Sequence, residues 1–429
     1  MQNVVDVTEG LAQRSDAELV HTVASIISVP RVDVANSFVL HAPLELAARS
    51  ALLPYVVEEQ RIDARKQIAR IAGQYVGFGA GIDDAGKPGG GPYPETSTRV
   101  DFDDVCAATS SLVSAIAAAD LEGADHAAVW LSANLNPEML RSCLADVVAP
   151  SLAAAAHGSI FLYLLPRVAP RGEQLTAMIR PLVRELARYP ELRLNWQHDI
   201  VKPSGPNTTV GDGLALEAAL ASVPQLGIPG SDFIFPVMHQ VESSGVASDV
   251  LTNALAGTPL REATVVILRT AAASMLGESD QYAPYGWSHC LTMPQGVLGI
   301  AHDSCDSAQL IAIAATYVVG FRAAFGQCDP DTGYAPIDPG VRLRDALAAG
   351  ADRATTAAAA AHDYRDDPLV VRTLLATAAS TQEDAHLVKY VLASFDAAAT
   401  DPVCGPMYMA AAASLCSYWH GVYGARSSG

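Results

Sequence analysis

Segments rich in alanine and leucine, in which apolar residues recur about every 3.6 residues, dominate this chain and constrain its fold more than any other feature. Alternating strand-like runs are few, and alanine and leucine have high helix propensity. The sequence therefore predicts an all-α protein built as a large multi-helix bundle. Half of its 429 residues are hydrophobic and 17% are charged, which indicates a well-buried interior. Because no fixed repeat or sharp change of composition divides the chain, we expect a single helical domain over residues 1–429.

Two stretches rich in glycine and proline interrupt the helical pattern. Residues 77–99 hold the densest run of both residue types, and residues 202–213 are polar and also rich in them. Neither stretch can form a regular element, so we expect two long loops that could serve as lids. A phosphate-binding loop is a weak interpretation of the first stretch, because Lys87 is followed by Pro88 and not by a Ser or Thr that opens a helix.

The net charge of -19 bears on the partners of the protein. Nucleic acids and anionic membrane surfaces bind clustered positive charge, and no run of Lys and Arg occurs. No stretch of about 20 uncharged apolar residues is present, and the first six residues lack a basic region followed by a hydrophobic one. We therefore expect a cytoplasmic protein that binds neither nucleic acid nor membrane. The seven scattered cysteines, without a C-x-x-C pair, are typical of a reducing compartment.

The segment from Glu383 to Tyr390 is the clearest candidate for chemistry. It lies within residues 370–398, whose apolar spacing predicts a helix, so His386 and Lys389 would share one face. An imidazole can bind a metal directly, whereas a lysine could join it only after losing a proton or becoming a carbamate. The alternative is a core histidine beside a lysine whose amine reaches water.

Two further histidines lie in predicted helices. His41 stands four residues before Glu45, a spacing that could present both to a metal, but Glu45 also stands four residues before Arg49 and an ion pair competes for it. His157 follows four alanines and precedes an apolar run, which predicts burial. A buried imidazole must satisfy both ring nitrogens, so His157 is either a ligand or a hydrogen-bonded core residue.

A fourth candidate, His289, follows a cluster of aromatic residues and helix breakers. Tyr282, Tyr285 and Trp287 precede it, and an apolar segment follows. Aromatic side chains beside a histidine can form the wall of a pocket for a flat ligand. The alternative is that they fill a junction between helices.

In their order along the chain, these blocks resemble the questin oxidase-like proteins of aromatic polyketide metabolism. The resemblance covers about residues 36–420. It is carried by an early helix with Asn36 and His41, the block Ala-Ala-His157-Gly-Ser-Ile, the block Ser-His289-Cys-Leu-Thr-Met-Pro, and the block Asp384-Ala-His386-Leu-Val-Lys389.

The resemblance implies an iron-dependent oxygenase with a mononuclear non-heme centre inside the bundle. The implied Fe(II) ligands are His41, His157, His289, His386 and the carboxylated form of Lys389. Imidazoles suit Fe(II), and the carbamate would supply the anionic oxygen that Asp or Glu usually provides. Burial in an apolar bundle would favour the neutral amine that reacts with carbon dioxide.

Other residues would support this centre. The acidic residues expected to orient the ligands are Glu45, Asp363, Asp384 and Glu383, although surface charges are the competing interpretation, and Glu45 could also be an extra ligand. The residues expected to stack on an aromatic substrate are Phe161, Tyr282, Tyr285 and Trp287.

The predicted function is therefore an oxygenase of secondary metabolism. It would use O2 to insert oxygen into, or cleave, a carbon–carbon bond of a polycyclic aromatic or quinone-like substrate. One alternative is a Baeyer–Villiger-type monooxygenase that takes electrons from NADPH. The NADPH would be an external reductant, because the chain has no G-x-G-x-x-G motif that would predict a bound nicotinamide or flavin. Another is a non-catalytic helical scaffold without metal. A hydrolase finds little support, because G-x-S-x-G and H-E-x-x-H are absent. The oligomeric state, a homodimer included, stays open.

Overall fold

A computed structural model gives the fold of the chain. It describes residues 9–27, 36–77, 100–168, 173–196, 213–231, 233–256, 258–304, 306–332 and 339–427. Within these ranges the regular elements are all helical, and the β-type pairing is an isolated bridge between Ser151 and Arg193. The predicted all-α fold is confirmed. The two predicted lid loops, residues 77–99 and 202–213, lie outside the described residues except for residues 77 and 213.

The chain divides into two compact units. The first consists of Met1–Ala51, Glu58–Arg193 and His302–Cys305, and the second of Leu52–Val57, Leu194–Ala301 and Asp306–Gly429. Each unit is therefore assembled from segments far apart in the sequence. The expectation of a single helical domain over residues 1–429 stays a prediction, and the units are described in turn.

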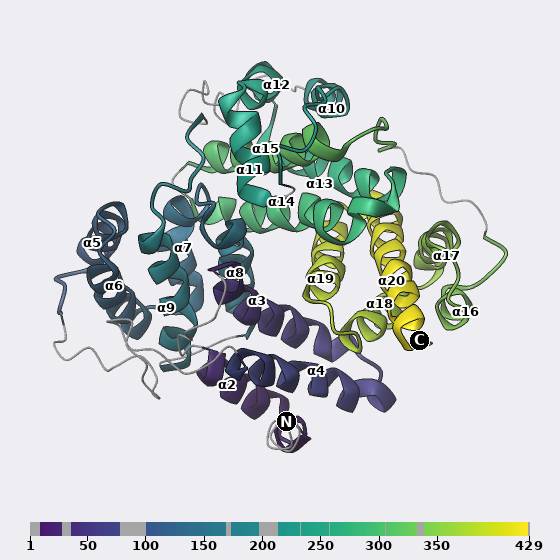
Figure 1. Ribbon diagram of the computed structural model, residues 1–429, viewed down its shortest axis with the longest axis horizontal. Helices are drawn as coiled ribbons and strands as arrows, with labels where there is room; N and C mark the ends of the chain where they lie inside the picture. Colours follow the sequence, from purple (N-terminus) through teal and green to yellow (C-terminus); the bar gives the residue numbers. More distant parts are fainter. Residues whose placement is uncertain are drawn as a thin grey trace. The chain divides into compact units, whose positions relative to one another are not determined.

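The first unit is built from helices α2 to α9. Helix α5 packs against α6, α6 against α9, and α2 against both α4 and α9, while α7 contacts α8 (Figure 1). Short 3-10 turns, η2 (Ala153–Ala156) and η3 (Leu165–Val168), flank α8. The bounds are α2 Asp16–Ile27, α3 Asn36–Leu52, α4 Glu58–Val76, α5 Val105–Ala117, α6 Leu121–Asn134, α7 Pro137–Val148, α8 Gly158–Leu164 and α9 Glu173–Arg188.

Polar side chains cap the N-termini of three of these helices. The side chains of Asp104, Asp120 and Asn136 accept hydrogen bonds from backbone N–H groups at the starts of α5, α6 and α7. Each such cap stabilises a helix by about 1 kcal/mol. Between α6 and α9, the buried carboxylate of Asp125 pairs with the guanidinium of Arg180, with the Nε–Oδ1 distance at 2.7 Å. This buried ion pair helps to fix how the two helices meet.

The second unit is built around α14 and α15, which are almost entirely buried. Helix α14 packs against α13, α15 and α19, and α19 packs in turn against α18 and α20 (Figure 1). The bounds are η1 Leu53–Tyr55, α10 Leu214–Ala221, α11 Ile234–Ser243, α12 Val246–Leu255, α13 Leu260–Gly277, η5 Asp280–Tyr282, η6 Ala283–Trp287, α14 Ser288–Ile300, α15 Ser307–Phe325, α16 Leu343–Ala349, α17 Arg353–Asp366, α18 Pro368–Ser380, α19 Ala385–Thr400, η8 Pro402–Cys404 and α20 Gly405–Ser427. The short η7, Ala301–Asp303, begins in this unit and ends in the first.

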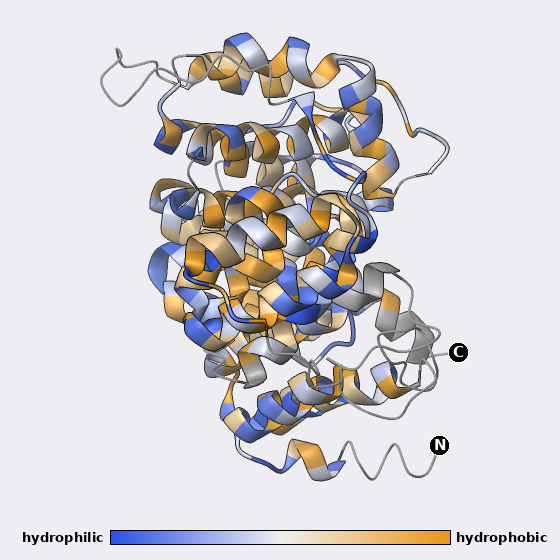
Figure 2. Ribbon diagram, turned by 90° about the vertical axis from the view of Figure 1, so that its left-hand side faces the viewer, coloured by the Kyte–Doolittle hydropathy of each residue, from blue (hydrophilic) through white to orange (hydrophobic). Residues whose placement is uncertain are grey.

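Helix α15 is unusually long and apolar. Among the described residues it is the one helix long and apolar enough to cross a membrane, and 89% of that window is buried inside the protein. A buried core helix of a soluble protein has the same composition. Most other helices carry both apolar and polar residues, as the mixed colours along single ribbons show (Figure 2), which is the pattern of helices with one buried face.

Two predicted helices are wrong in their extent. The helix expected over residues 370–398 is interrupted after Ser380, and a new helix begins at Ala385 with Asp384 as its cap. The sequence pattern of residues 137–165, broken by Gly158, also predicts helix, but α7 ends earlier, at Val148. Residues 149–157 between α7 and α8 hold turns and the short η2. Both interruptions place a candidate histidine at or near a helix start.

Candidate metal centre

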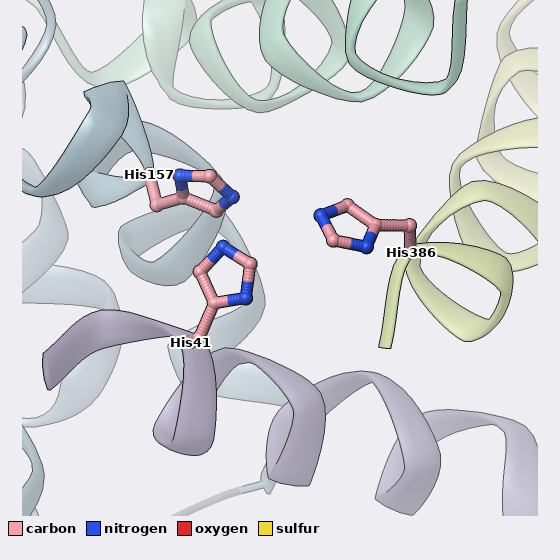
Figure 3. Close-up of side chains that lie close together, drawn as sticks. All are labelled: His41, His157 and His386. Carbon is pink, nitrogen blue, oxygen red and sulfur yellow. The ribbon is translucent and has the colours of Figure 1, made fainter. Parts of the chain in front are cut away.

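In the first unit, two candidate histidines meet. His41 projects from α3 and His157 lies at the start of α8, with their ring centroids 4.3 Å apart and the ring planes inclined by 47°. A ring nitrogen of each lies within 4.8 Å of one of the other. Figure 3 draws these two rings side by side, together with His386 of the second unit. Imidazoles that are more than a hundred residues apart in sequence are therefore neighbours within one unit.

The hydrogen bonds of His157 settle which ring nitrogen carries its proton. Nδ1 lies 2.8 Å from the carbonyl oxygen of Ala155 and 3.2 Å from that of Ala154. A carbonyl oxygen can only accept, so Nδ1 must be the protonated, donating nitrogen. In the neutral ring, Nε2 then holds the lone pair that can bind a metal. Ligating histidines are typically held in this way, through a hydrogen bond from the second nitrogen.

The backbone before His157 is unusual. Ala154, Ala155 and Ala156 have φ angles of 48°, 54° and 59°, in the left-handed region. Alanine strongly prefers right-handed helix, and the left-handed form costs roughly 1–2 kcal/mol per residue. Next in the chain, Gly158 packs closely, because a Cβ there would lie 3.0 Å from Val148 Cγ1. Tertiary packing thus overrides a strong local preference at this point.

Glu45 forms the ion pair that was the alternative to metal binding. Its buried carboxylate accepts a hydrogen bond from Arg49 Nε at 2.7 Å, and Arg70 Nη2 lies 3.5 Å away. Two guanidinium groups therefore share this carboxylate. A further role of Glu45 at the metal, as an extra ligand or a partner that orients one, stays a prediction.

In the second unit, His289 on α14 and His386 on α19 form the other histidine pair. Their ring centroids are 4.9 Å apart and the rings are nearly perpendicular, at 83°. Lys389, one helical turn beyond His386, is only 3% exposed. Burial, then the nearby charges of His386 and Lys389, lower the pKa of His289 well below its usual value. His289 is therefore a neutral imidazole at ordinary pH, the form that binds metals.

Both histidines of this pair have an acceptor close to Nδ1. The Nδ1 of His289 is hydrogen-bonded to the carbonyl oxygen of Tyr285, one turn earlier, so this nitrogen carries the proton. The Nδ1 of His386 lies 3.5 Å from the Asp384 carboxylate. That carboxylate also accepts the backbone N–H groups of His386 and Leu387, at 2.8 and 3.0 Å. Asp384 therefore caps α19 and lies beside the ring that it was predicted to orient.

The charge state of Asp384 follows from the same contacts. Burial alone would raise the pKa of its carboxyl group, but the hydrogen bond and charge of His386, the N–H of Leu387 and the charge of Lys389 outweigh it and hold this pKa below its ordinary value. Asp384 is thus an anion beside His386. Its role as an orienting partner of a metal ligand stays a prediction.

A turn of π-helix, η6, precedes His289 and supplies the Tyr285 carbonyl. Its Gly286 leaves no room for a side chain, since a Cβ would lie 3.1 Å from the Phe325 ring and 3.0 Å from Tyr282 Cβ. Such π turns are frequent at functional sites because they redirect one side chain or carbonyl out of the regular pattern. Here the redirected carbonyl meets the His289 ring.

The four aromatic residues predicted to contact a substrate have different surroundings. Trp287 and Phe161 are fully buried, and Trp287 packs edge-on against Phe325 with centroids 6.1 Å apart. Tyr282 stacks on the same Phe325 ring at 4.4 Å. Tyr285, by contrast, is 53% exposed and lies edge-on to His386 with centroids 4.9 Å apart. Only Tyr285 among the four combines an exposed surface with contact to a candidate ligand.

The contacts of Asp363 differ from those expected of a residue that orients a metal ligand. Its carboxylate accepts the backbone N–H of Leu343 at 2.9 Å and pairs with Arg342 Nε at 3.0 Å, and His362 Nδ1 lies 3.4 Å away. These contacts hold the start of α16, and none of the three partners is a candidate ligand. Glu383, the remaining acidic candidate, is exposed just before the cap of α19.

Two aromatic residues beside the site were not singled out by the sequence. Phe321 on α15 stacks on His289, with centroids 6.4 Å apart and planes inclined by 14°. Trp419 on α20 meets the Tyr285 ring at 6.1 Å. Both belong to long helices with many apolar residues, so no local signal separates them from the rest of the core.

The fold and the site together define a class: an all-helical protein in which each of two units brings a pair of buried or half-buried histidines together. In comparisons with known proteins, no family model, no curated protein and no solved structure matches the chain.

Proposed function

We propose that this protein is a mononuclear non-heme iron oxygenase. In this proposal one Fe(II) is bound by His41 and His157 of the first unit together with His289, His386 and carboxylated Lys389 of the second. The observation that carries it is the orientation of three imidazoles. The Nδ1 atoms of His157 and His289 donate to backbone carbonyls, and that of His386 lies beside a carboxylate. This arrangement is the usual support of metal-binding histidines.

The donor set suits iron. Neutral imidazoles bind Fe(II) well, and the usual complement in such oxygenases is one anionic oxygen ligand. Lys389 is buried beside the histidine pair of the second unit, where a carbamate would supply that oxygen. Bound Fe(II) would supply the activation of O2. The protein's own residues would hold the ligand rings in one tautomer and keep water away from them.

The proposed substrate is a polycyclic aromatic or quinone-like molecule. Support comes from Tyr285, whose exposed ring borders His386 and is itself flanked by Trp419. A flat aromatic molecule can stack on such a surface. The reaction would insert oxygen into, or cleave, a carbon–carbon bond of this substrate in the cytoplasm. A monooxygenase of this type would need external NADPH as reductant, whereas a dioxygenase would not.

A metal-free helical scaffold is the second candidate. It is favoured by the same hydrogen bonds, because a histidine whose Nδ1–H meets a carbonyl, as in His157, is also a satisfied core residue. The two candidates differ in whether Nε2 binds a metal.

The function is tested by oxygen consumption. Protein loaded anaerobically with Fe(II) should consume O2 when anthraquinone-type substrates are added, and the His157→Ala variant should lose this activity by at least about 100-fold. His126→Ala, at a half-buried histidine on α6 of the same unit, serves as the matched control and should keep it. Iron-loaded wild-type protein that consumes no O2 with any quinone or polycyclic aromatic offered would contradict the oxygenase proposal.

A further inference from the structure

The turn before His157 departs from ordinary backbone geometry more than any other described segment. Four non-glycine residues in the described part of the chain have a positive φ, and three of them are consecutive: Ala154, Ala155 and Ala156. The fourth, Ala119, stands alone with φ 56° at the end of α5. Strained conformations of this kind persist only where the surroundings enforce them, and they gather at functional sites.

The surroundings of the turn do enforce it. All three alanines are buried. Just before them, the Leu152 N–H donates to the Leu192 carbonyl at 2.7 Å, and the Ala156 N–H returns to the Leu152 carbonyl at 3.2 Å. Just after them, Gly158 packs against Val148 with no space for a Cβ. Both ends of the turn are therefore anchored within the first unit.

The left-handed conformation has a specific consequence for His157. In a right-handed helix the carbonyls of residues 154 and 155 would point along the axis toward the N–H groups of residues 158 and 159. Here both lie against the side-chain Nδ1 of His157, at 3.2 and 2.8 Å, and the Ala154 carbonyl also accepts the backbone N–H of His157 at 3.3 Å. Two acceptors on one ring nitrogen fix both the tautomer and the orientation of the ring.

We propose that the left-handed Ala154–Ala156 turn is a positioning device for His157. It keeps the proton on Nδ1 and presents Nε2 as the metal-binding atom before any metal arrives. The role of Nε2 rests on the proposed function, whereas the tautomer is a property of the metal-free protein. None of the three alanines carries a metal-binding side chain, so they act through His157.

Substitutions at Ala155 can separate this role from simple packing. Glycine adopts positive φ without penalty, so Ala155→Gly should keep the turn and its carbonyls. A β-branched residue is disfavoured there, so Ala155→Val should shift the turn and move the carbonyl away from His157. Ala119 has almost the same φ but is exposed and remote from His157 in sequence. Ala119→Val and Ala119→Gly are therefore matched controls for backbone strain.

The first test reads the tautomer directly. Metal-free, full-length protein labelled with 15N-histidine is studied by two-bond proton–nitrogen correlation at neutral pH, and the His157 signals are assigned by their loss in His157→Gln. We expect the Nδ1–H form in the wild type and in Ala155→Gly, and a mixture or the Nε2–H form in Ala155→Val. An Nε2–H wild-type ring overturns the inference without reference to any variant. So does a folded Ala155→Val protein with the wild-type pattern.

The second test reads the consequence for metal binding, with Co(II) as the probe. Ala155→Val should raise the dissociation constant for Co(II) by roughly 10–100-fold and change its ligand-field absorption spectrum, as expected when the support of a ligand is lost. Ala155→Gly, Ala119→Val and Ala119→Gly should keep the wild-type affinity and spectrum. If the wild type binds Co(II) and Ala155→Val binds it equally well, the positioning role is wrong while the metal site stands. If the wild type binds no Co(II), the proposed function fails while the tautomer measurement still decides the inference.

Discussion

At the scale of single residues, the proposed metal binding depends on which nitrogen of each imidazole carries the proton. His157 and His289 each donate Nδ1–H to a carbonyl, and His386 has a carboxylate beside the same atom. The groups that set this arrangement are the backbone carbonyls of an alanine and a tyrosine and the carboxylate of a helix-capping aspartate. Asp384 could be named from the sequence, whereas spacing along the sequence does not reveal the two carbonyls.

Lys389 is the residue whose role is most open to a direct test. Replacing it with alanine removes the proposed anionic oxygen, so the iron content of Lys389→Ala should fall by at least about ten-fold. Lys389→Glu offers a carboxylate on a shorter arm and should recover part of that loss. Iron content after anaerobic loading measures both, with exposed Lys66→Ala as the control. Equal iron in Lys389→Ala and the wild type would remove Lys389 from the ligand set.

Tyr285 and Trp287 should respond differently to truncation, because one is half exposed and the other is fully buried. Tyr285→Ala keeps the backbone carbonyl that holds His289, so it should weaken binding of an aromatic substrate and leave iron content unchanged. Trp287→Ala should lower the free energy of unfolding by about 3–5 kcal/mol, as is typical for a large buried side chain. Substrate titration and thermal unfolding of both variants compare the two effects. A Tyr285→Ala variant that binds substrate normally would contradict its assignment to the substrate surface.

At the scale of helices, the predicted bounds are correct where the apolar periodicity runs over a long segment. They are wrong where tertiary packing or a capping residue determines the end of a helix. The apolar pattern of residues 306–325 runs without interruption and predicts a helix there, which matches α15. The break at residues 381–384 was missed although Asp384 is a typical N-cap residue. The left-handed turn after α7 could not be predicted at all, since four alanines favour right-handed helix and only tertiary contacts reverse that preference.

Gly158 shows how closely α8 approaches its neighbours. A Cβ there would lie 3.0 Å from Val148 on α7 and 3.1 Å from Leu182 on α9. Gly158→Ala should therefore destabilise the protein by about 1–3 kcal/mol through overpacking. Gly421→Ala on α20, where nothing lies within 4 Å, should be neutral or slightly stabilising because alanine favours helix. Urea unfolding measures both, and a Gly158→Ala protein as stable as Gly421→Ala would show that α8 can move.

The buried face of α9 makes the stability of the first unit depend on pH. Burial raises the pKa of Glu185 to about 7, against the opposing charge of Arg188. Because the folded-state pKa lies above the ordinary value of 4.5, the protein loses stability as pH rises from the lower value to the higher one. Glu185→Gln, which stays neutral, should gain about 1–3 kcal/mol above pH 7 and nothing below pH 4.5.

Unfolding curves at several pH values check this dependence. Glu122→Gln, at an exposed carboxylate on α6, is the control and should follow the wild type. A gain for Glu185→Gln that is the same at all pH values would mean that the carboxyl group does not change its charge state on folding.

At the scale of the whole molecule, each unit holds one pair of histidines, and the proposed iron needs donors from both. The candidate histidines were identified in the sequence through ordered short motifs, because residues such as His41 and His157 have no spacing that relates them. The structure brings them together in pairs inside each unit. The proposed joining of the two pairs on one ion is the central claim for the whole molecule.

The most direct measurement of this claim is iron stoichiometry with one histidine removed from each unit. Wild-type protein loaded anaerobically should hold about one Fe(II) per chain, and His157→Ala and His386→Ala should each hold almost none, since both contribute to the same ion. His126→Ala and His362→Ala, which replace histidines outside the candidate set of each unit, should hold as much iron as the wild type. Two ions per chain that are lost separately, or iron content unchanged in either histidine variant of the site, would contradict a shared centre.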